Sequence, residues 1–357
     1  MVYPENESEF TGLLGQSSQQ PPWITTPLLY SKGLSDAAGC QVYMKLDNHQ
    51  PSGSFKSRGV GNLCLKAFQS RSLAPSPSSP SSKPLKFYSS SGGNAGLAAV
   101  TAAHSLGCTC TVVVPETTTQ LMMDKIRAAG GEVLQHGESW GEADEYLRAL
   151  MKMEADTEEG VYCPPFDHED IWEGNSTLIN EVLTQLPPGP PPAALIASIG
   201  GGGLYLGLQL GLDAHSLSST PIIAVEPAGA ASLAYSLSHG GNTPFPKITS
   251  IATSLGARRV ADRAYELASQ RGNVRSVVLT EAQAAMGCVR FADEERMLVE
   301  AACGVSLAAV YGGYVRKVLP GVREKDRVVV VVCGGSAVSL EMLVRGVAFC
   351  YPEWESH

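Results

Sequence analysis

The sequence has few charged residues and no local cluster of basic ones. Of its 357 residues, 17% are charged, and 26 Lys and Arg stand against 35 Asp and Glu, which gives a net charge of −9. Nucleic acids and anionic membrane surfaces attract basic proteins, so we expect neither as a partner. The chain also lacks an apolar run of about 20 residues, the length that a membrane-spanning helix needs.

Several chemical signatures are missing as well. The nine cysteines include no Cys-x-x-Cys pair, and the seven histidines include no pair four residues apart. We therefore expect no structural zinc, disulfide framework or histidine metal site. Residues Met1–Gln20 lack the basic and apolar regions of a secretory signal. These absences predict a cytoplasmic protein with reduced thiols.

The chain does contain short apolar runs that alternate with helical patterns. This alternation predicts an α/β protein, because parallel strands need a helical crossover between them. The apolar runs are nearly continuous Val and Ile, as in strands that helices cover on both faces. We expect two open, twisted, mostly parallel sheets flanked by helices. The predicted strands are 87–88, 109–114, 132–134, 194–199, 222–225 and 327–332, and the predicted helices are 95–106, 120–129, 141–153, 204–212 and one after Ser336.

A chain of this length exceeds the usual size of a single hydrophobic core, so two domains are expected. We predict a large domain from residues 21–56 and 161–357, and a small α/β domain from residues 57–160. Residues 1–20 are predicted to form a flexible tail. Residues 72–84 are rich in Ser and Pro and can bury little apolar surface, which predicts a disordered insertion.

Lys56 is the first candidate for catalysis. It lies in Pro51–Gly59, among small and turn-forming residues and directly after Phe55. A lysine amine can condense with an aldehyde when a partly desolvated pocket keeps it deprotonated some of the time. Phe55 could form one wall of that pocket against an aromatic ring. An isolated lysine is more often a solvated residue at a turn, so this hypothesis depends on the neighbouring motifs.

Two glycine-rich turns follow predicted strands. In Ser90–Gly96, two glycines bring backbone N–H groups close to a ligand, and the following helix N-terminus attracts an anion such as an amino-acid carboxylate. Asn94 is a favoured N-cap residue there, and an ordinary turn is an equally good interpretation. Gly200–Gly203 leave nothing between the backbone amides and a phosphate. The dinucleotide pattern Gly-x-Gly-x-x-Gly fails, because Leu206 or Tyr205 occupies its third glycine position.

Cys333–Ser336 forms a third turn of this kind, after the last apolar strand. Ligands of parallel sheets bind beyond the carboxyl ends of the strands, so the three turns favour one shared site. A buried thiol is usually a packing residue. Facing a pyridine nitrogen, however, Cys333 would leave the ring largely neutral, which suits elimination better than reactions that prolong a carbanion. Glu226, Glu300 and the turn Ser254–Ala257 could supply oxygens to a monovalent cation.

These motifs occur in an order that resembles one family. From about Thr26 to Leu343, the chain is similar to the eukaryotic liver-type L-serine dehydratase/L-threonine deaminase group, within the tryptophan-synthase-β-like pyridoxal-phosphate enzymes. The resemblance implies the fold of that group (fold type II), pyridoxal 5'-phosphate as cofactor and a homodimer. The matching stretches are Pro51–Lys56, Ser90–Gly96, Pro164–Asp167, Trp172–Gly174, Gly200–Gly203 and Cys333–Ser336.

The resemblance also implies roles for single residues. Lys56 would form the imine with the cofactor aldehyde, Phe55 would stack near the cofactor ring, and Cys333 would face the ring nitrogen. Asn94 would lie near the ring oxygen of the cofactor. The residues that would bind the cofactor phosphate are Gly200, Gly201, Gly202 and Gly203.

Two further sets follow from the same resemblance. The residues that would bind the substrate carboxylate are Ser91, Gly92, Gly93, Asn94 and Ala95. The residues that would hold a monovalent cation, K⁺ in this hypothesis, are Glu226, Ala230, Leu255 and Ala257. Some members of the group carry alanine in place of Gly92, so more room is expected there in this chain.

The implied activity is the β-elimination of L-serine, and of L-threonine, to pyruvate or 2-oxobutanoate plus ammonia. Relatives that resemble serine racemase or biosynthetic threonine deaminase carry serine in place of Cys333. A racemase and a sulfur-adding β-replacement enzyme are the alternatives within the same chemistry. From other classes, the alternatives are a nicotinamide-dependent oxidoreductase, which only Glu226 favours, and a catalytically silent binding protein.

Overall fold

The structure, a computed structural model, describes residues 20–73 and 83–344. The predicted flexible tail and most of the predicted Ser/Pro insertion lie outside these residues, so both stay predictions. Within the described ranges, no helix is long and apolar enough to cross a membrane.

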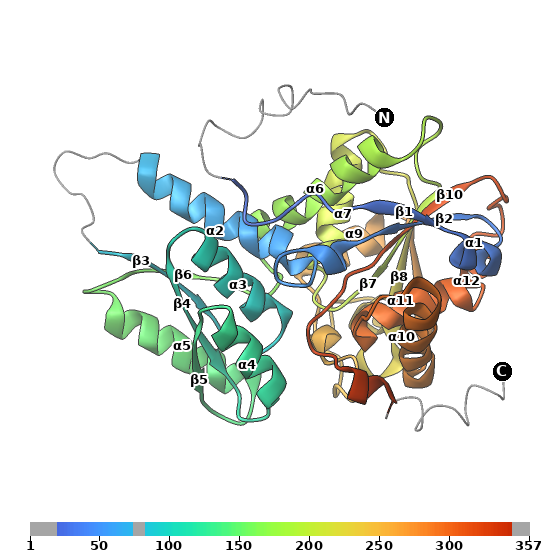
Figure 1. The fold of residues 1–357 in the computed structure, drawn as a ribbon. Coiled ribbons are helices and arrows are strands. Elements are labelled where there is room, and N and C mark those ends of the chain that lie inside the picture. The colour runs from blue at the N-terminus through green and yellow to red at the C-terminus, as the bar shows by residue number, and fades with distance from the viewer. Residues whose placement is uncertain (1–19, 74–82, 345–357) are drawn as a thin grey trace.

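Two sheets organise the described part of the chain (Figure 1). The larger has the strand order β1-β2-β10-β7-β8-β9, in which β1 and β2 pair antiparallel and the other neighbours pair parallel. The smaller has the order β5-β4-β3-β6 and is parallel throughout. The predicted pair of mostly parallel sheets is therefore confirmed.

The bounds of the elements are as follows. The strands are β1 (Leu28–Ser31), β2 (Gln41–Lys45), β3 (Leu85–Ser89), β4 (Thr109–Val114), β5 (Glu132–Gln135), β6 (Glu159–Tyr162), β7 (Ala194–Ser198), β8 (Ile222–Pro227), β9 (Val274–Leu279) and β10 (Arg327–Val331). The helices are α1 (Lys32–Ala38), α2 (Lys56–Leu73), α3 (Asn94–Ser105), α4 (Gln120–Ala128), α5 (Trp140–Glu154), α6 (Glu169–Gln185), α7 (Gly203–Ala214), α8 (Ser232–His239), α9 (Asp262–Gln270), α10 (Glu281–Glu295), α11 (Ala301–Tyr311) and α12 (Tyr314–Val318).

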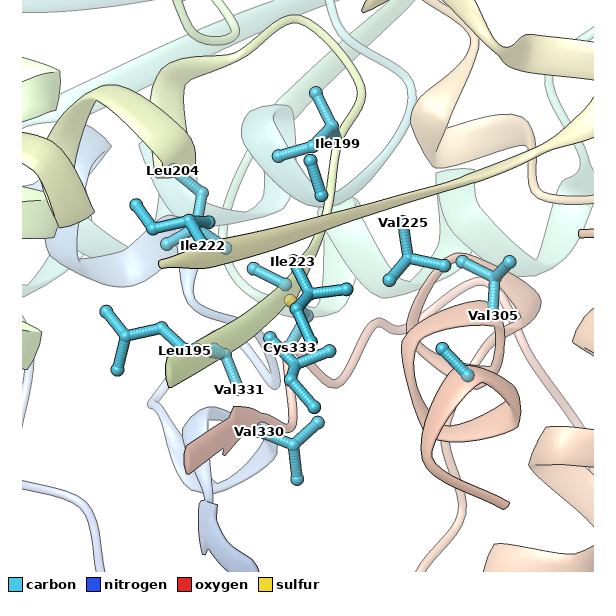
Figure 2. Packing of buried hydrophobic residues seen from close by; sticks show 14 of the residues in the cluster. Leu195, Ile199, Leu204, Ile222, Ile223, Val225, Val305, Val330, Val331 and Cys333 are labelled. Carbon is cyan, nitrogen blue, oxygen red and sulfur yellow. The ribbon is translucent and has the colours of Figure 1, made fainter. Parts of the chain in front are cut away.

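The centre of the large sheet is buried on both faces. Every residue of β7, β8 and β10 is buried, as expected for continuous Val and Ile runs between two layers of helices. Helices α10 and α11 lie on one side of the sheet, and α6 and α7 lie on the other (Figure 1). Figure 2 shows Leu195, Ile223 and Val330 from these three strands in one cluster with Val305 of α11.

The small sheet divides its side chains between two apolar clusters. Phe87 and Val112 pack with residues of α2, α3 and α4. Tyr88 and Val113, each one position further along its strand, pack with Leu147 of α5 in a separate cluster. Successive residues of a strand point to opposite faces, so α5 covers the face opposite α3 and α4, as Figure 1 shows.

Most predicted elements lie within two residues of the observed ones, and Thr109–Val114 matches without a shift. The helix predicted after Ser336 is an exception, because it begins only at Leu340. The N–H groups of Ser336 and Ala337 donate to side chains of Asn94 and Glu300, which holds this stretch in a turn. No element was predicted for β1, β2, β6, β9, α1, α2, α6, α8, α9, α10, α11 or α12. The domain boundaries stay a prediction, since α2 contacts both α3 and α6.

The first turn of α2 is fixed by a buried ionic network. Arg58 is fully buried, its Nε and Nη2 donate to Asp47 at 2.7 and 2.8 Å, and its Nη1 donates to Glu181 Oε1 at 2.5 Å. Lys45 Nζ lies 2.5 Å from Glu181 Oε2. Two cations thus match two carboxylates. Because the network joins β2, α2 and α6, it fixes how α2, which begins at Lys56, leaves the large sheet.

We expect Arg58→Met to lower the free energy of unfolding by about 3–5 kcal/mol, because the change leaves two carboxylates in the interior with one cation fewer. Urea unfolding measures this loss. The control is Arg323→Met, which removes an exposed pair with Asp326 and is expected to leave the unfolding midpoint unchanged. Equal effects of the two substitutions would show that the buried network does not stabilise the fold.

Candidate active site

One cavity, with a volume of about 50 Å³, lies beyond the carboxyl ends of β7 and β10. The predicted site residues that line it are Phe55, Lys56, Asn94, Gly200, Gly201, Gly202, Gly203, Leu255 and Cys333. The predicted residues that are not part of its wall are Ser91, Gly92, Gly93, Ala95, Glu226, Ala230 and Ala257.

Lys56 begins α2, and part of its surface lines the cavity. The amine donates a hydrogen bond to the carbonyl of Pro165 and lies 5.1 Å from the centre of the Phe55 ring. No carboxylate pairs with this amine among the described residues. Burial lowers the pKa of Lys56 to about 8. Roughly a tenth of the amine is then neutral at pH 7, against less than about a thousandth for an ordinary lysine.

The turn Gly200–Gly203 joins β7 to α7. Gly202 has a φ of +90°, a conformation that side chains other than glycine rarely adopt. A Cβ atom on Gly201 would lie 2.3 Å from the ring of Phe166. Among the described residues, the N–H groups of Gly200, Gly201 and Gly202 have no protein acceptor. Unpaired amides at a helix N-terminus are the groups that bind a phosphate, so this turn fits one.

Cys333 follows β10 directly and lines the same cavity. Its Sγ lies 3.7 Å from Ser198 Oγ, and its carbonyl accepts a hydrogen bond from the N–H of Phe55 at 3.1 Å. Burial raises the pKa of Cys333 to about 12, so the thiol is uncharged at neutral pH. Figure 2 shows this residue among the side chains of the apolar cluster that includes Val331 and Ile223.

Asn94 connects the two sheets. The sequence predicted it as the N-cap of α3, but this prediction is wrong, because Gly93 is the N-cap and Asn94 is the first helical residue. The Asn94 side chain instead forms hydrogen bonds with residues that are distant in the sequence. Its Nδ2 donates to Glu300 Oε1 at 2.8 Å and to Ser254 Oγ at 3.2 Å, and its Oδ1 accepts from the N–H of Ser336 at 2.8 Å. Asn94 therefore fixes the start of α3 to the large sheet at the cavity wall.

Glu300 was considered in the sequence only as a possible cation ligand, whereas the structure places it in the cavity wall. It precedes α11 and is buried, which raises the pKa of its carboxyl group, although hydrogen bonds from Ser254, Asn94 and Ala337 oppose that rise. One feature of the sequence could have indicated Glu300 as a site residue: it is a single acidic residue at the start of an apolar helix. The carbonyl of Pro165 was also missed as a contact of Lys56. Phe166, from the matching stretch Pro164–Asp167, lies against the glycine turn.

The turn from Ser91 to Gly93 lies between β3 and α3, next to Asn94. The expectation of extra room at Gly92 is wrong, because a Cβ atom there would lie 2.7 Å from both Cγ2 and Oγ1 of Thr118. Thr118 comes from the segment before α4 and fills the space that a larger residue 92 would need.

Glu226 ends β8 away from the cavity wall. Its two oxygens accept from the N–H groups of Leu233 and Ala234 at 2.7 and 2.9 Å. Burial raises the pKa of Glu226 to about 7, and no ion pair to it is found among the described residues. The neighbouring Ser232 Oγ donates to the carbonyl of Ala257. The structure thus brings Ala257 next to the start of α8, the helix whose N–H groups donate to Glu226.

A partly neutral lysine, an uncharged thiol and a glycine turn with free amides define a cofactor-dependent enzyme on an α/β fold. Comparison with known proteins agrees with this class. A family model described as "Pyridoxal-phosphate dependent enzyme" matches residues 20–334, and the chain therefore belongs to the pyridoxal-phosphate dependent enzyme family.

Three relatives show where in that family the chain lies. It is 42% identical over 330 residues to an L-serine dehydratase of Saccharomyces cerevisiae, which covers 90% of this chain and 95% of the relative. It is 39% identical over 329 residues to the L-serine dehydratase/L-threonine deaminase of Homo sapiens, which covers 91% and 95%. The crystal structure of a fungal L-serine ammonia-lyase from Rhizomucor miehei superposes with a TM-score of 0.83 at 35% identity, over 92% of this chain and 99% of that one.

We expect Gly201→Ala to weaken the binding of pyridoxal phosphate by about one to two orders of magnitude. The added methyl group must displace the Phe166 ring, and overpacking of this kind costs about 1–3 kcal/mol. Titration of the cofactor-free protein, followed by the absorption of the bound cofactor, measures the affinity. Gly321→Ala is the control, because a Cβ atom there meets nothing within 4 Å. Unchanged affinity in Gly201→Ala would contradict the placement of the phosphate.

Proposed function

We propose that this chain is a pyridoxal-phosphate-dependent lyase that converts L-serine, and also L-threonine, to pyruvate or 2-oxobutanoate plus ammonia. The observation that carries the proposal is the buried amine of Lys56, held without a carboxylate partner in the cavity that Cys333 and the glycine turn share. Relatives named as L-serine dehydratases support the choice of substrate.

The residues of the cavity fit the cofactor. We assign its phosphate to Gly200–Gly203, where N–H groups have no protein acceptor and where contact with Phe166 excludes a side chain on Gly201. Phe55 would stack near the ring, Cys333 would face its nitrogen, and Asn94 would lie near its oxygen. When bound, pyridoxal phosphate withdraws electrons from the bonds at the substrate Cα.

The chain itself supplies the base. Lys56 Nζ can accept the proton from the substrate Cα because its lowered pKa leaves part of the amine neutral, and the Pro165 carbonyl holds the amine in place. Cys333 carries no charge at neutral pH and therefore adds no stabilisation to a persistent carbanion, which favours loss of the β-hydroxyl. The turn Ser91–Ala95 would bind the substrate carboxylate through its backbone amides.

We also propose a K⁺ site at Glu226, with the carbonyl groups of Ala230, Leu255 and Ala257 as further ligands. The support is the buried, unpaired Glu226 carboxylate, which a monovalent cation would neutralise. A homodimer stays a prediction from the resemblance, and a cytoplasmic location stays a prediction from the composition.

Lys56→Ala is expected to abolish the visible absorption of the bound cofactor and to lower pyruvate formation from L-serine by at least about 10²–10⁴-fold. Lys66→Gln is the matched control, since Lys66 lies on the same helix and pairs with Asp170 and Glu173 on the surface. Assays for D-serine and for cysteine formation separate the racemase and β-replacement alternatives. Activity retained in Lys56→Ala would refute the assignment.

We expect K⁺ to activate the enzyme with an affinity about tenfold weaker at pH 6 than at pH 8. With a pKa of about 7, Glu226 is mostly protonated at pH 6, so K⁺ must displace a proton there, whereas at pH 8 the carboxylate is already charged. Initial rates against KCl concentration at the two pH values measure this. Glu226→Gln should remove the response, while Glu142→Gln, which changes another carboxylate that accepts a backbone N–H group, should keep it. A response that persists in Glu226→Gln would place the cation elsewhere.

A further inference from the structure

A second ionic cluster lies next to the turn that begins at Ser91, outside the cavity. Its centre is Asp144 of α5, the helix that covers one face of the small sheet (Figure 1). Asp144 Oδ1 accepts hydrogen bonds from Ser90 Oγ at 2.7 Å and from the Tyr162 hydroxyl at 2.6 Å. Arg148 Nε donates to Oδ2 at 2.7 Å, and the guanidinium lies 4.0 Å from the centre of the Tyr162 ring.

The cluster fixes the direction of each of its hydrogen bonds. Burial would raise the pKa of Asp144, but hydrogen bonds from Tyr162, Arg148 and Ser90 hold it below the ordinary value. Burial and the bond to Asp144 raise the pKa of Tyr162 to about 12. At neutral pH, Asp144 is therefore an ionised acceptor, and both hydroxyl groups must donate to it. Bonds to an ionised acceptor are shorter and stronger than neutral ones.

Ser90 connects this rigid cluster to the turn. It is fully buried and is followed directly by Ser91, the first residue of the turn. On its other side, the turn packs so closely against α3 that a Cβ atom on Gly96 would lie 1.9 Å from the Ser91 carbonyl oxygen. The backbone that follows is held on two sides, and the N–H groups of Gly92 and Gly93 have little freedom to move.

Arg148 removes an electrostatic conflict. A lone carboxylate next to the turn would repel the carboxylate of a substrate. Because the positive charge of Arg148 balances the negative charge of Asp144, the cluster carries no net charge. Arg148 is half exposed, whereas the Asp144 side chain is only 13% exposed, so the neutralising charge sits on the solvent side.

We propose that Asp144 is a positioning residue for the substrate carboxylate, which acts through Ser90 on the backbone of the turn Ser91–Asn94. The proposal rests on the lyase function and assigns that function a residue on α5, outside the cavity and without contact to the cofactor site.

The test is Asp144→Asn in the cofactor-loaded enzyme. The asparagine side chain has the same shape as that of Asp144, but an NH₂ group takes the place of one carboxylate oxygen. Depending on which oxygen is replaced, either the hydroxyl groups of Ser90 and Tyr162 or the guanidinium of Arg148 loses its acceptor. We expect KM for L-serine to rise about tenfold or more, because small displacements of binding groups have large effects on affinity. We expect kcat to change less than about threefold and the absorption of the bound cofactor to stay as in the wild type.

Glu154→Gln is the matched control. Glu154 lies on the same helix and accepts hydrogen bonds from a tyrosine hydroxyl and a basic side chain, those of Tyr88 and Lys86, but it does not contact the turn. Its substitution should leave KM unchanged. A KM for Asp144→Asn within twofold of the wild-type value, or an equal rise in Glu154→Gln, would overturn the proposal.

Ser90→Ala provides a second variant that keeps the bonds of Asp144 to Tyr162 and Arg148 and removes only the connection to the turn. It should raise KM in the same direction, and an unchanged KM would count against the proposal. Binding of glycine, an amino acid without a leaving group, gives a readout that needs no turnover and is followed by the change in cofactor absorption. If the wild type binds glycine but forms no pyruvate from L-serine, the lyase function fails. If the wild type forms pyruvate from L-serine and Asp144→Asn binds glycine as tightly as the wild type does, only the proposal for Asp144 fails.

Discussion

The site depends on a difference between two buried cations that lie two residues apart in one helical turn. Arg58 has two carboxylates within hydrogen-bonding distance, and with them its charge is fully balanced. Lys56 has a carbonyl oxygen and an aromatic ring as neighbours, and burial therefore lowers the pKa of its amine. The balanced charge fixes the helix, and the unbalanced one supplies a reactive amine. Exchanging the two environments would leave a firmly protonated lysine that could neither condense with an aldehyde nor accept a proton.

The other groups are brought to this amine by the topology of the sheets. The glycine turn follows β7 and the Cys333 turn follows β10, so both reach the carboxyl edge of the large sheet, where ligands of such sheets bind. The substrate turn comes from the small sheet and needs a separate connection. Asn94 provides it through its bonds to Glu300 and Ser336, and Lys125 adds a bond to the Ser336 carbonyl at 2.5 Å. Polar contacts rather than a continuous apolar core thus join the substrate turn to the cofactor cavity.

The sequence predicted those parts of the structure that depend on local patterns. The strand Thr109–Val114 and the turn Gly200–Gly203 follow from a continuous apolar run and from four glycines, and the structure places both as expected. Asn94 was assigned wrongly as a cap, because the partners that engage its side chain lie 206 and 242 positions away. The room at Gly92 was misjudged for the same reason, since Thr118 reaches it from another segment. Helix α11 was missed because it is apolar all round and shows no periodicity.

The most direct test of the account is the pH dependence of the rate at which the cofactor-free protein combines with pyridoxal phosphate, followed by visible absorption. That rate depends on the neutral fraction of the Lys56 amine. A pKa of about 8 predicts a rate that rises about tenfold per pH unit up to pH 8 and then levels off. A rate that continues to rise to about pH 10, as for an ordinary lysine, would contradict the claim that burial without a counter-ion prepares this amine for its chemistry.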